Sequence, residues 1–218
     1  MENSNALSPV ILLAGGKSSR MGSPKGLISI KGRSLLEVQL EFFRAAGAGC
    51  AIVVLGFQRD AYLEKLPFLA EAERSPFLFG ELSVSVAINP RPEFGQFSSL
   101  KFALARAIPL AKQAAGFFVL PVDVLSPGRE TWLALEAFAR RVMPDAVIPE
   151  LNGDHGHPVW ISKSFAERLL AIPVESPEAR LDLQIRALPP DRRAYLAVSD
   201  PGIRMNLNTP EDVERELS

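Results

Sequence analysis

The sequence predicts one α/β domain over residues 1–218, built as a Rossmann-like three-layer sandwich with a mainly parallel sheet. Short apolar runs alternate with longer amphipathic stretches, which is the pattern of repeated strand–helix units. A length of 218 residues is one that α/β folds reach before they split into two domains. The 18 prolines are spread along the chain, so no linker is indicated.

The first half of the chain begins with a buried strand at residues 10–13. A helix should follow from Ser34, because Ser34 and Glu37 form a capping box ahead of apolar residues at helical spacing. Gly47 is expected to end this helix. The next predicted elements are strands at 51–55 and 82–88 and a helix at 97–108.

The second half continues with a buried strand at 117–120 that runs into Pro121-Val122-Asp123. Amphipathic and apolar patterns then predict a helix at 132–141, a strand at 146–148, an extended segment at 158–161, helices at 165–170 and 178–187, and a strand at 195–198. A final helix should start at Thr209, with Thr209 as its N-cap and Pro210 in the first turn.

Composition excludes several classes of protein. The net charge is −1, from 24 basic and 25 acidic residues, so nucleic-acid binding has little electrostatic support. The N-terminus is polar, and no apolar run approaches the ~20 residues of a membrane span. Cys50 is the single cysteine, so no intramolecular disulfide forms, and we expect a soluble cytoplasmic protein. The sequence leaves the oligomeric state open.

The loop LAGGKSSRMGSPKGL directly behind the first strand has the composition of a phosphate-binding site. Gly15 and Gly16 allow the backbone to approach a ligand and to aim its N–H groups at anionic oxygens. Lys17, Arg20 and Lys25 supply positive charge, and the arginine can bind two oxygens at once. Loops at the carboxyl end of the first strand are where α/β sheets bind ligands.

Two better-known phosphate motifs do not fit this loop. A P-loop needs a glycine five residues before Gly16, but Ile11 stands there, inside the strand. The dinucleotide pattern begins correctly at Gly47-Ala48-Gly49, yet that run follows a helix and precedes a strand, the reverse of the required order.

Asp123 directly follows the predicted strand at 117–120, and its carboxylate should lie on the same edge of the sheet as the glycine loop. Mg²⁺ takes one or two carboxylates together with phosphates and water, so Asp123 is a candidate magnesium ligand. An aspartate after a strand is, taken alone, more often a turn or helix cap. The phosphate-type loop favours metal binding.

The full pattern L-A-G-G-x-S-x-R-M-G-x-x-K resembles the signature of the nucleotidyltransferases related to molybdenum cofactor guanylyltransferase and molybdopterin cytidylyltransferase. The C-terminal MNLNTPEDVERE is similar to the same family. The resemblance implies a fold of nucleotide-diphospho-sugar transferase type and Mg²⁺ held by Asp123. Asn208 stands where many relatives carry a second metal-binding acid. Relatives often carry a proline close behind the metal-binding aspartate, whereas here Pro127 lies further along the chain. The implied nucleotide-binding residues are Leu13, Ala14, Gly15, Gly16, Asn89, Gly95, Ser98 and Ser99.

The acceptor side is implied by two further segments. The run GHPV around His157 resembles the cytidylyltransferase branch, and a purely structural role for His157 stays open. Asn206 alternates with Asn208 along an extended segment, so both side chains should face the same side. His155 and His157 have no third His or Cys nearby, which argues against a zinc site.

The resemblance implies transfer of an NMP group from GTP or CTP to a small phosphorylated acceptor, with molybdopterin as the expected acceptor and pyrophosphate as the product. Arg20, Lys25 and Asp123 would be the catalytic residues. Gly15 has no Cβ and should leave room for a purine, which favours GTP over CTP. Two alternatives are a sugar- or alditol-phosphate nucleotidyltransferase and a nucleotide-binding regulator with weakened catalysis. A hydrolase is disfavoured, because no G-x-S-x-G elbow is present.

Overall fold

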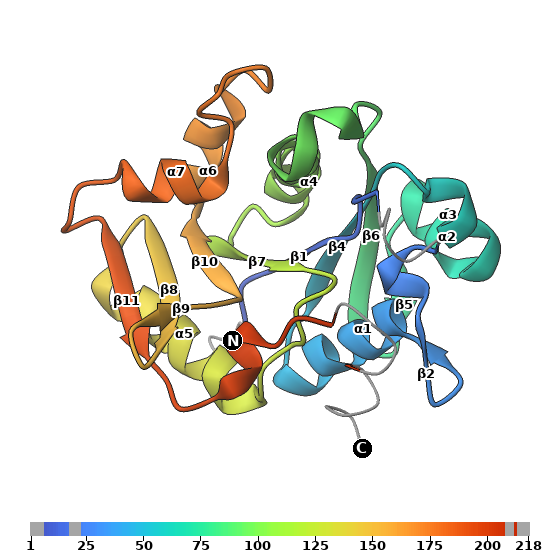
Figure 1. The fold of residues 1–218 in the computed structure, drawn as a ribbon, viewed down its shortest axis with the longest axis horizontal. Helices are drawn as coiled ribbons and strands as arrows, with labels where there is room; N and C mark the ends of the chain where they lie inside the picture. Colours follow the sequence, from blue (N-terminus) through green and yellow to red (C-terminus); the bar gives the residue numbers. More distant parts are fainter. Residues whose placement is uncertain (1–6, 18–22, 208–211, 213–218) are drawn as a thin grey trace.

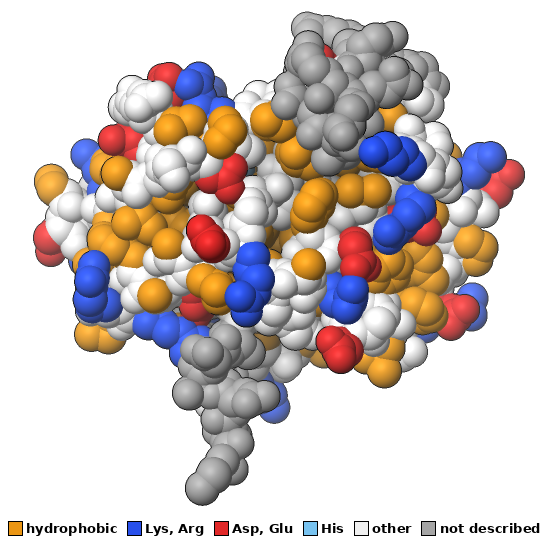
Figure 2. All heavy atoms as spheres, turned by 90° about the horizontal axis from the view of Figure 1, so that it is seen from below, with side chains coloured by type: hydrophobic (Ala, Val, Ile, Leu, Met, Phe, Trp, Pro, Cys, Tyr) orange, Lys and Arg blue, Asp and Glu red, His pale blue; other side chains and the backbone are white. Residues whose placement is uncertain are grey.

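A computed structural model describes residues 7–17, 23–207 and 212. Its centre is a twisted sheet with helices on both faces, as Figure 1 shows, with α4, α6 and α7 above the sheet and α1 and α5 below it. This is the three-layer α/β architecture that the sequence predicts. Figure 2 shows one face of the molecule, on which basic and acidic side chains are interspersed.

The main sheet has the strand order β11-β8-β10-β7-β1-β4-β6-β5, and β9 pairs with β8. Strands β6, β4, β1 and β7 run parallel, whereas β10 is antiparallel to both of its neighbours. The strands of the main sheet are β1 (Val10–Leu13), β4 (Cys50–Leu55), β5 (Phe77–Phe79), β6 (Leu82–Ile88), β7 (Gly116–Pro121), β8 (Ala146–Leu151), β9 (Asp154–His155), β10 (Val159–Ser162) and β11 (Arg193–Ala197). A separate hairpin pairs β2 (Ser29–Ile30) with β3 (Arg33–Ser34).

The helices divide between the two faces of the sheet according to the core cluster that they join. One cluster contains buried residues of α1, α2, α3 and α5, and the other contains those of α4, α6 and α7. The helices are α1 (Leu35–Ala46), α2 (Arg59–Lys65), α3 (Phe68–Arg74), α4 (Gly95–Leu110), α5 (Arg129–Val142), α6 (Lys163–Leu170) and α7 (Leu181–Arg186). In the described part of the chain, no helix is both long and apolar enough to span a membrane.

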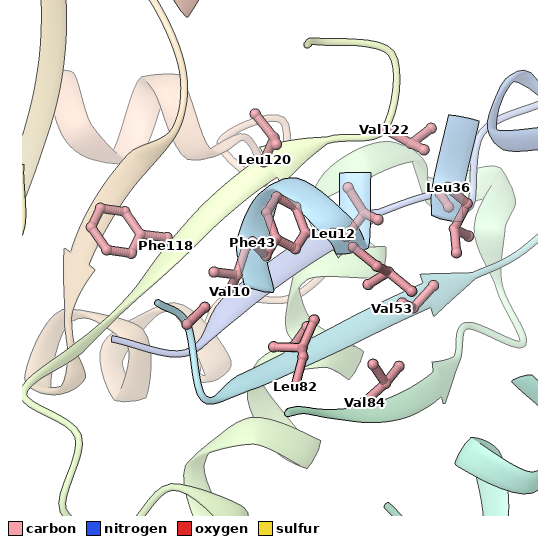
Figure 3. Packing of buried hydrophobic residues seen from close by; sticks show 14 of the residues in the cluster. Val10, Leu12, Leu36, Phe43, Val53, Leu82, Val84, Phe118, Leu120 and Val122 are labelled. Carbon is pink, nitrogen blue, oxygen red and sulfur yellow. The ribbon is translucent and has the colours of Figure 1, made fainter. Parts of the chain in front are cut away.

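The central strand β1 is buried on both sides. Val10 and Leu12 join the cluster with α1, and Ile11 and Leu13 join the cluster with α4, because successive side chains of a strand point to opposite faces. Figure 3 shows Phe43 of α1 packed beside the side chains of the first face. Such burial explains why this strand reads as a continuous apolar run.

The predicted helix boundaries at Ser34 and Gly47 are confirmed. The Ser34 hydroxyl accepts the N–H of Glu37, and the Glu37 carboxylate accepts the N–H of Ser34, which completes the capping box. Gly47 closes α1 in the left-handed region with φ of 94°, a conformation that glycine adopts without steric cost. Strand β1 and strand β6 have the predicted bounds.

Most of the other predicted bounds differ from the observed ones by one to three residues, and several elements were not predicted. The predicted helix at 178–187 is helical only over Leu181–Arg186, because residues before it form a turn in which the Ser176 hydroxyl accepts the N–H of Glu178. Strand β11 begins two residues earlier than predicted and ends one residue earlier. Helices α2 and α3 and strands β2, β3, β5 and β9 were missed. The helix predicted from Thr209 lies outside the described residues.

Candidate active site

The parallel strands β1 and β7 lie side by side, and the order in which the chain adds strands to the sheet reverses between them. From β1 it crosses through α1 to β4 and then β6, whereas α4 carries it back across the other face to β7. The carboxyl ends of β1 and β7 therefore form a topological switch point, the place where open α/β sheets bind ligands. Leu13 and Pro121 are paired at this edge.

A cleft of about 420 Å³ opens at this edge. The residues 13–17 behind β1 line one wall, including the predicted Leu13, Ala14, Gly15 and Gly16. Gly15 lies against Gly56 and α4, and a Cβ built on it would meet the Ser99 hydroxyl oxygen at 2.9 Å. The missing side chain of Gly15 thus lets three segments approach one another, which differs from the purine space inferred from the sequence.

Two of the predicted catalytic residues come together across the cleft. Lys25 Nζ lies 2.6 Å from Asp123 Oδ2, although the residues are 98 positions apart in the sequence. Their side chains are 23% and 31% exposed, so both reach the cleft and are partly shielded from solvent. Arg20 lies outside the described residues, and its predicted role stays a prediction.

Tyr62 of α2 supports the turn that presents Lys25, and it was not predicted from the sequence. The Tyr62 hydroxyl accepts the N–H of Gly26 at 3.1 Å, and a Cβ on Gly26 would lie 2.6 Å from that oxygen. Burial raises the pKa of Tyr62, the nearby Asp123 carboxylate raises it further, and the Gly26 N–H opposes both. Tyr62 is therefore a neutral phenol that lines the cleft beside Lys25.

The opposite wall comes from the start of α4. Gly95 and Ser99, both predicted, line the cleft together with Gln96, which was missed. Asn89 and Ser98 are buried behind this wall. Asn89 Nδ2 donates to the hydroxyls of Ser98 and Ser99 at 2.8 and 3.0 Å. Asn89 thus holds the first turn of α4 in place, and direct contact of Asn89 or Ser98 with a nucleotide stays a prediction.

Two further cavities adjoin the cleft. One, of about 560 Å³, has mostly apolar walls and is bordered by α7, His157 and the stacked rings of His155 and Tyr195. The other, of about 400 Å³, contains Asp123 and the predicted Asn206. Gln96 and Pro121 border all three cavities, so the three adjoin one another around the end of β7.

His157 lies between the two adjoining cavities. Burial lowers the pKa of its imidazole, although the Val119 backbone and the Asp123 carboxylate oppose that effect. Its Nδ1 is buried and has no hydrogen-bond partner among the described residues. The imidazole is consequently a neutral group beside Asp123.

The C-terminal segment reaches the site as the sequence predicts. Asn206 pairs with Val124 in an antiparallel bridge, and the Leu207 N–H donates to the Asp123 carbonyl at 2.7 Å. The Asn206 side chain borders the same cavity as Asp123 and donates to the Arg204 carbonyl at 3.1 Å. Asn208, the predicted second metal ligand, lies outside the described residues.

The described side chains fit a magnesium ion only in company with a phosphate ligand. Asp123 is a partly exposed carboxylate at the junction of two cavities. Within the described ranges, no three His, Cys, Asp or Glu side chains gather into a metal cluster. A single carboxylate that faces a phosphate-type loop suits Mg²⁺, which keeps several waters and binds substrate phosphates.

Comparison with known proteins identifies the family of the chain. Residues 10–187 match the model of the MobA-like NTP transferase domain. No curated protein matches the sequence.

Solved structures share the fold. Rv0371c from Mycobacterium tuberculosis H37Rv is 21% identical over 97% of this chain and 98% of its own, with a TM-score of 0.71. A second structure of Rv0371c is a complex with manganese. Molybdopterin-guanine dinucleotide biosynthesis protein A from Archaeoglobus fulgidus is 20% identical over 95% of both chains, with a TM-score of 0.65. The 4-diphosphocytidyl-2C-methyl-D-erythritolsynthase from Anaerococcus prevotii is 15% identical over 97% of this chain and 94% of its own, with a TM-score of 0.63.

Proposed function

Since the chain belongs to the family of MobA-like NTP transferase domains, which are nucleotidyltransferases, we propose that it transfers an NMP group from GTP or CTP to a phosphorylated acceptor of the molybdopterin type. Pyrophosphate is the second product. The observation that carries the proposal is the Lys25–Asp123 ion pair at the switch point, in a glycine-lined cleft that shares Gln96 and Pro121 with a larger cavity.

In the proposed reaction, a phosphate oxygen of the acceptor attacks the α-phosphorus of the triphosphate. The new P–O bond joins the acceptor to the NMP group, and the bond from the α-phosphorus to the bridging oxygen breaks, so its electrons leave with pyrophosphate. Both reactants carry negative charge, so their approach needs neutralisation and fixed orientation more than a protein nucleophile. Lys25 and Arg20 supply the positive charge in this proposal.

We assign Asp123 as the carboxylate that holds Mg²⁺, with the Asn208 amide as a candidate second ligand. A divalent ion bound there would neutralise charge on the phosphate oxygens. A structure of Rv0371c is a complex with manganese, which supports a divalent cation for that protein. Rv0371c resembles this chain in fold. The partly exposed Asp123 carboxylate beside the cleft supports the assignment for this chain.

The larger cavity supports an acceptor with a ring system over a sugar or alditol phosphate. Its floor is formed by apolar side chains of the sheet and α4, among them Val119, Ile148 and Leu100. Hydroxyls of a polyhydroxylated acceptor that face these groups would lack hydrogen-bond partners, at a cost of about 1–3 kcal/mol for each buried group. Arg180, Asp182 and Arg186 also line the cavity and can bind the polar groups of an acceptor. A flat heterocycle buries its faces there at no such cost, and Tyr195 and His155 offer ring surfaces at the rim.

We propose GTP over CTP as the nucleotide, because the run Leu13-Ala14-Gly15-Gly16 resembles the form common in guanylyltransferase relatives. Gly15 packs against Ser99 of α4. A substitution at Gly15 would therefore change base preference by displacing α4, and not by filling open space next to the base. Measuring the affinity of each triphosphate with Mg²⁺ tests the preference, and tighter binding of CTP would contradict it.

The proposed function is tested by pyrophosphate release. The protein is incubated with each of the four common ribonucleoside triphosphates, with Mg²⁺ or Mn²⁺, and with molybdopterin, a sugar phosphate or an alditol phosphate as acceptor. Release that requires molybdopterin supports the proposal, whereas release only with a sugar or alditol phosphate supports the alternative transferase. Triphosphate binding without release for any acceptor in the panel would instead favour the nucleotide-binding regulator.

A further inference from the structure

Gln39 is a fully buried polar side chain on the apolar face of α1. Its neighbours on this face are Leu36, Leu40 and Phe43, all of them fully buried. A buried amide is costly unless its donors and acceptor are bonded. Gln39 therefore needs hydrogen-bond partners inside the protein.

All the partners of Gln39 belong to the segment that carries Asp123. Gln39 Nε2 donates to the carbonyls of Val122 at 3.1 Å and Val124 at 2.6 Å. Gln39 Oε1 accepts the N–H of Ser126 at 3.1 Å. One side chain thus binds the backbone immediately before and immediately after Asp123.

The Asp123 peptide is also held by the C-terminal segment. The Leu207 N–H donates to the Asp123 carbonyl, and the Leu125 N–H donates to the carbonyl of Met205 at 2.9 Å. Gln39 and residues 205–207 together fix the backbone, while the Asp123 side chain stays at the cleft beside Lys25. A carboxylate on a fixed backbone keeps its direction without rearranging when a ligand binds.

We propose that Gln39 is a positioning residue that orients the Asp123 carboxylate toward a divalent cation. This inference rests on the proposed function, because it takes Asp123 as the metal-binding carboxylate. Groups that support a metal ligand without touching the metal typically change metal affinity by about 10–100-fold when they are removed. Gln39 acts here through the backbone of its partner and touches neither nucleotide nor acceptor.

The test uses Gln39→Met, which keeps the length of the side chain and removes all three hydrogen bonds. Glu136→Gln is the matched control, because Glu136 is also buried and binds the backbone N–H of Ser8 at 2.8 Å. Ser8 lies at the other end of β1, roughly 16 Å from the site at the usual rise of a strand. For each full-length variant we would measure the free energy of unfolding and the Kd for Mn²⁺ in the presence of saturating GTP and without acceptor, from the enhancement of water-proton relaxation in the ternary complex.

We expect Gln39→Met to raise the Kd for Mn²⁺ by about tenfold or more. Glu136→Gln should lower stability and leave that Kd within about twofold of wild type, since it acts far from the metal carboxylate. Asp123→Asn serves as the reference for loss of the site. Equal Mn²⁺ affinity in Gln39→Met and wild type, with binding lost in Asp123→Asn, would overturn the inference and leave the metal assignment intact.

Two other results have distinct meanings. Wild-type Mn²⁺ affinity in Asp123→Asn would overturn the metal assignment of the proposed function, and the inference with it. Equal weakening by Gln39→Met and Glu136→Gln would show general destabilisation and overturn the inference alone. If Gln39→Met does not fold, hydrogen exchange of the Ser126 amide in the wild-type protein without metal is the deciding measurement. We expect the Ser126 amide to be protected about as well as the amides of β1. Exchange as fast as in an exposed loop would contradict the inference.

Discussion

Replacing Gly15 by alanine tests whether this glycine is needed for close packing. The new Cβ would lie 2.9 Å from the Ser99 hydroxyl oxygen and 3.4 Å from the Gly56 nitrogen. The hydroxyl would have to move by roughly 0.5 Å or more to reach an ordinary contact distance. Its 3.0 Å hydrogen bond from Asn89 would be strained or lost.

The expected loss of stability follows from these contacts. A lost hydrogen bond costs about 1 kcal/mol, and overpacking costs about 1–3 kcal/mol. We therefore expect Gly15→Ala to lower the free energy of unfolding by about 2 kcal/mol, a fall of about 4–8 °C in Tm for a chain of this size. Urea unfolding followed by circular dichroism measures the change.

A double-mutant cycle with Ser99→Ala isolates the contact. Removing the hydroxyl removes the atom that the new Cβ would strike, so the double variant should be more stable than the sum of the single changes predicts, by about 1–2 kcal/mol. Additivity within about 0.5 kcal/mol would refute the packing argument. The ratio of GTP to CTP affinity, measured in the same variants, shows whether the contact affects the choice of base.

Four further results are expected. Asp123→Ala should reduce pyrophosphate release by about a hundredfold or more with little change in circular dichroism, because it removes the carboxylate that is paired with Lys25 in the cleft. Substantial Mg²⁺-dependent turnover would contradict its assigned role. Lys25→Ala and Arg20→Ala should each cost a few kcal/mol in kcat/KM, on the order of one preorganised electrostatic partner, and full activity in Arg20→Lys would show that a bidentate arginine is unnecessary. Burial lowers the pKa of His157 from 6.5, so the folded state binds fewer protons than the unfolded state, and stability should fall as pH drops below about 6.5. The free energy of unfolding in urea should therefore change less between pH 7.5 and pH 5.5 in His157→Gln than in wild type. An equal change in both proteins would refute this. Asn208→Asp should keep or improve Mg²⁺ affinity in a titration of activity, and weaker affinity would remove Asn208 from the ligand set.

The elements that could be predicted from sequence are those with a strong local signal. Strand β1 is a short apolar run between Pro9 and the glycine loop, and α1 begins at a capping box and ends at a glycine. Helices α2 and α3 were missed because each has seven residues and neither begins with a side-chain cap. Short helices of this kind depend on tertiary packing, here through Tyr62 and Leu69, which a local pattern does not reveal.

The candidate site was predictable where its residues follow strands. Parallel strands place their carboxyl ends on one edge, which is why Lys25 and Asp123, named from separate motifs, prove to be paired. Tyr62 and Gln96 were not predicted, because neither residue type nor spacing marks them as part of the site. Gln39 did leave a signal, since it is a polar residue at helical spacing among Leu36, Leu40 and Phe43.

The adjacency of the three cavities around Gln96 and Pro121 has a kinetic consequence. A site that holds triphosphate and acceptor side by side allows direct transfer in a ternary complex, without a covalent enzyme intermediate. Under the proposed function, double-reciprocal plots at several acceptor concentrations should therefore intersect, and not run parallel as in a ping-pong scheme. One in-line displacement also inverts the configuration at the α-phosphorus, so a chiral α-thiotriphosphate should yield a product of opposite handedness.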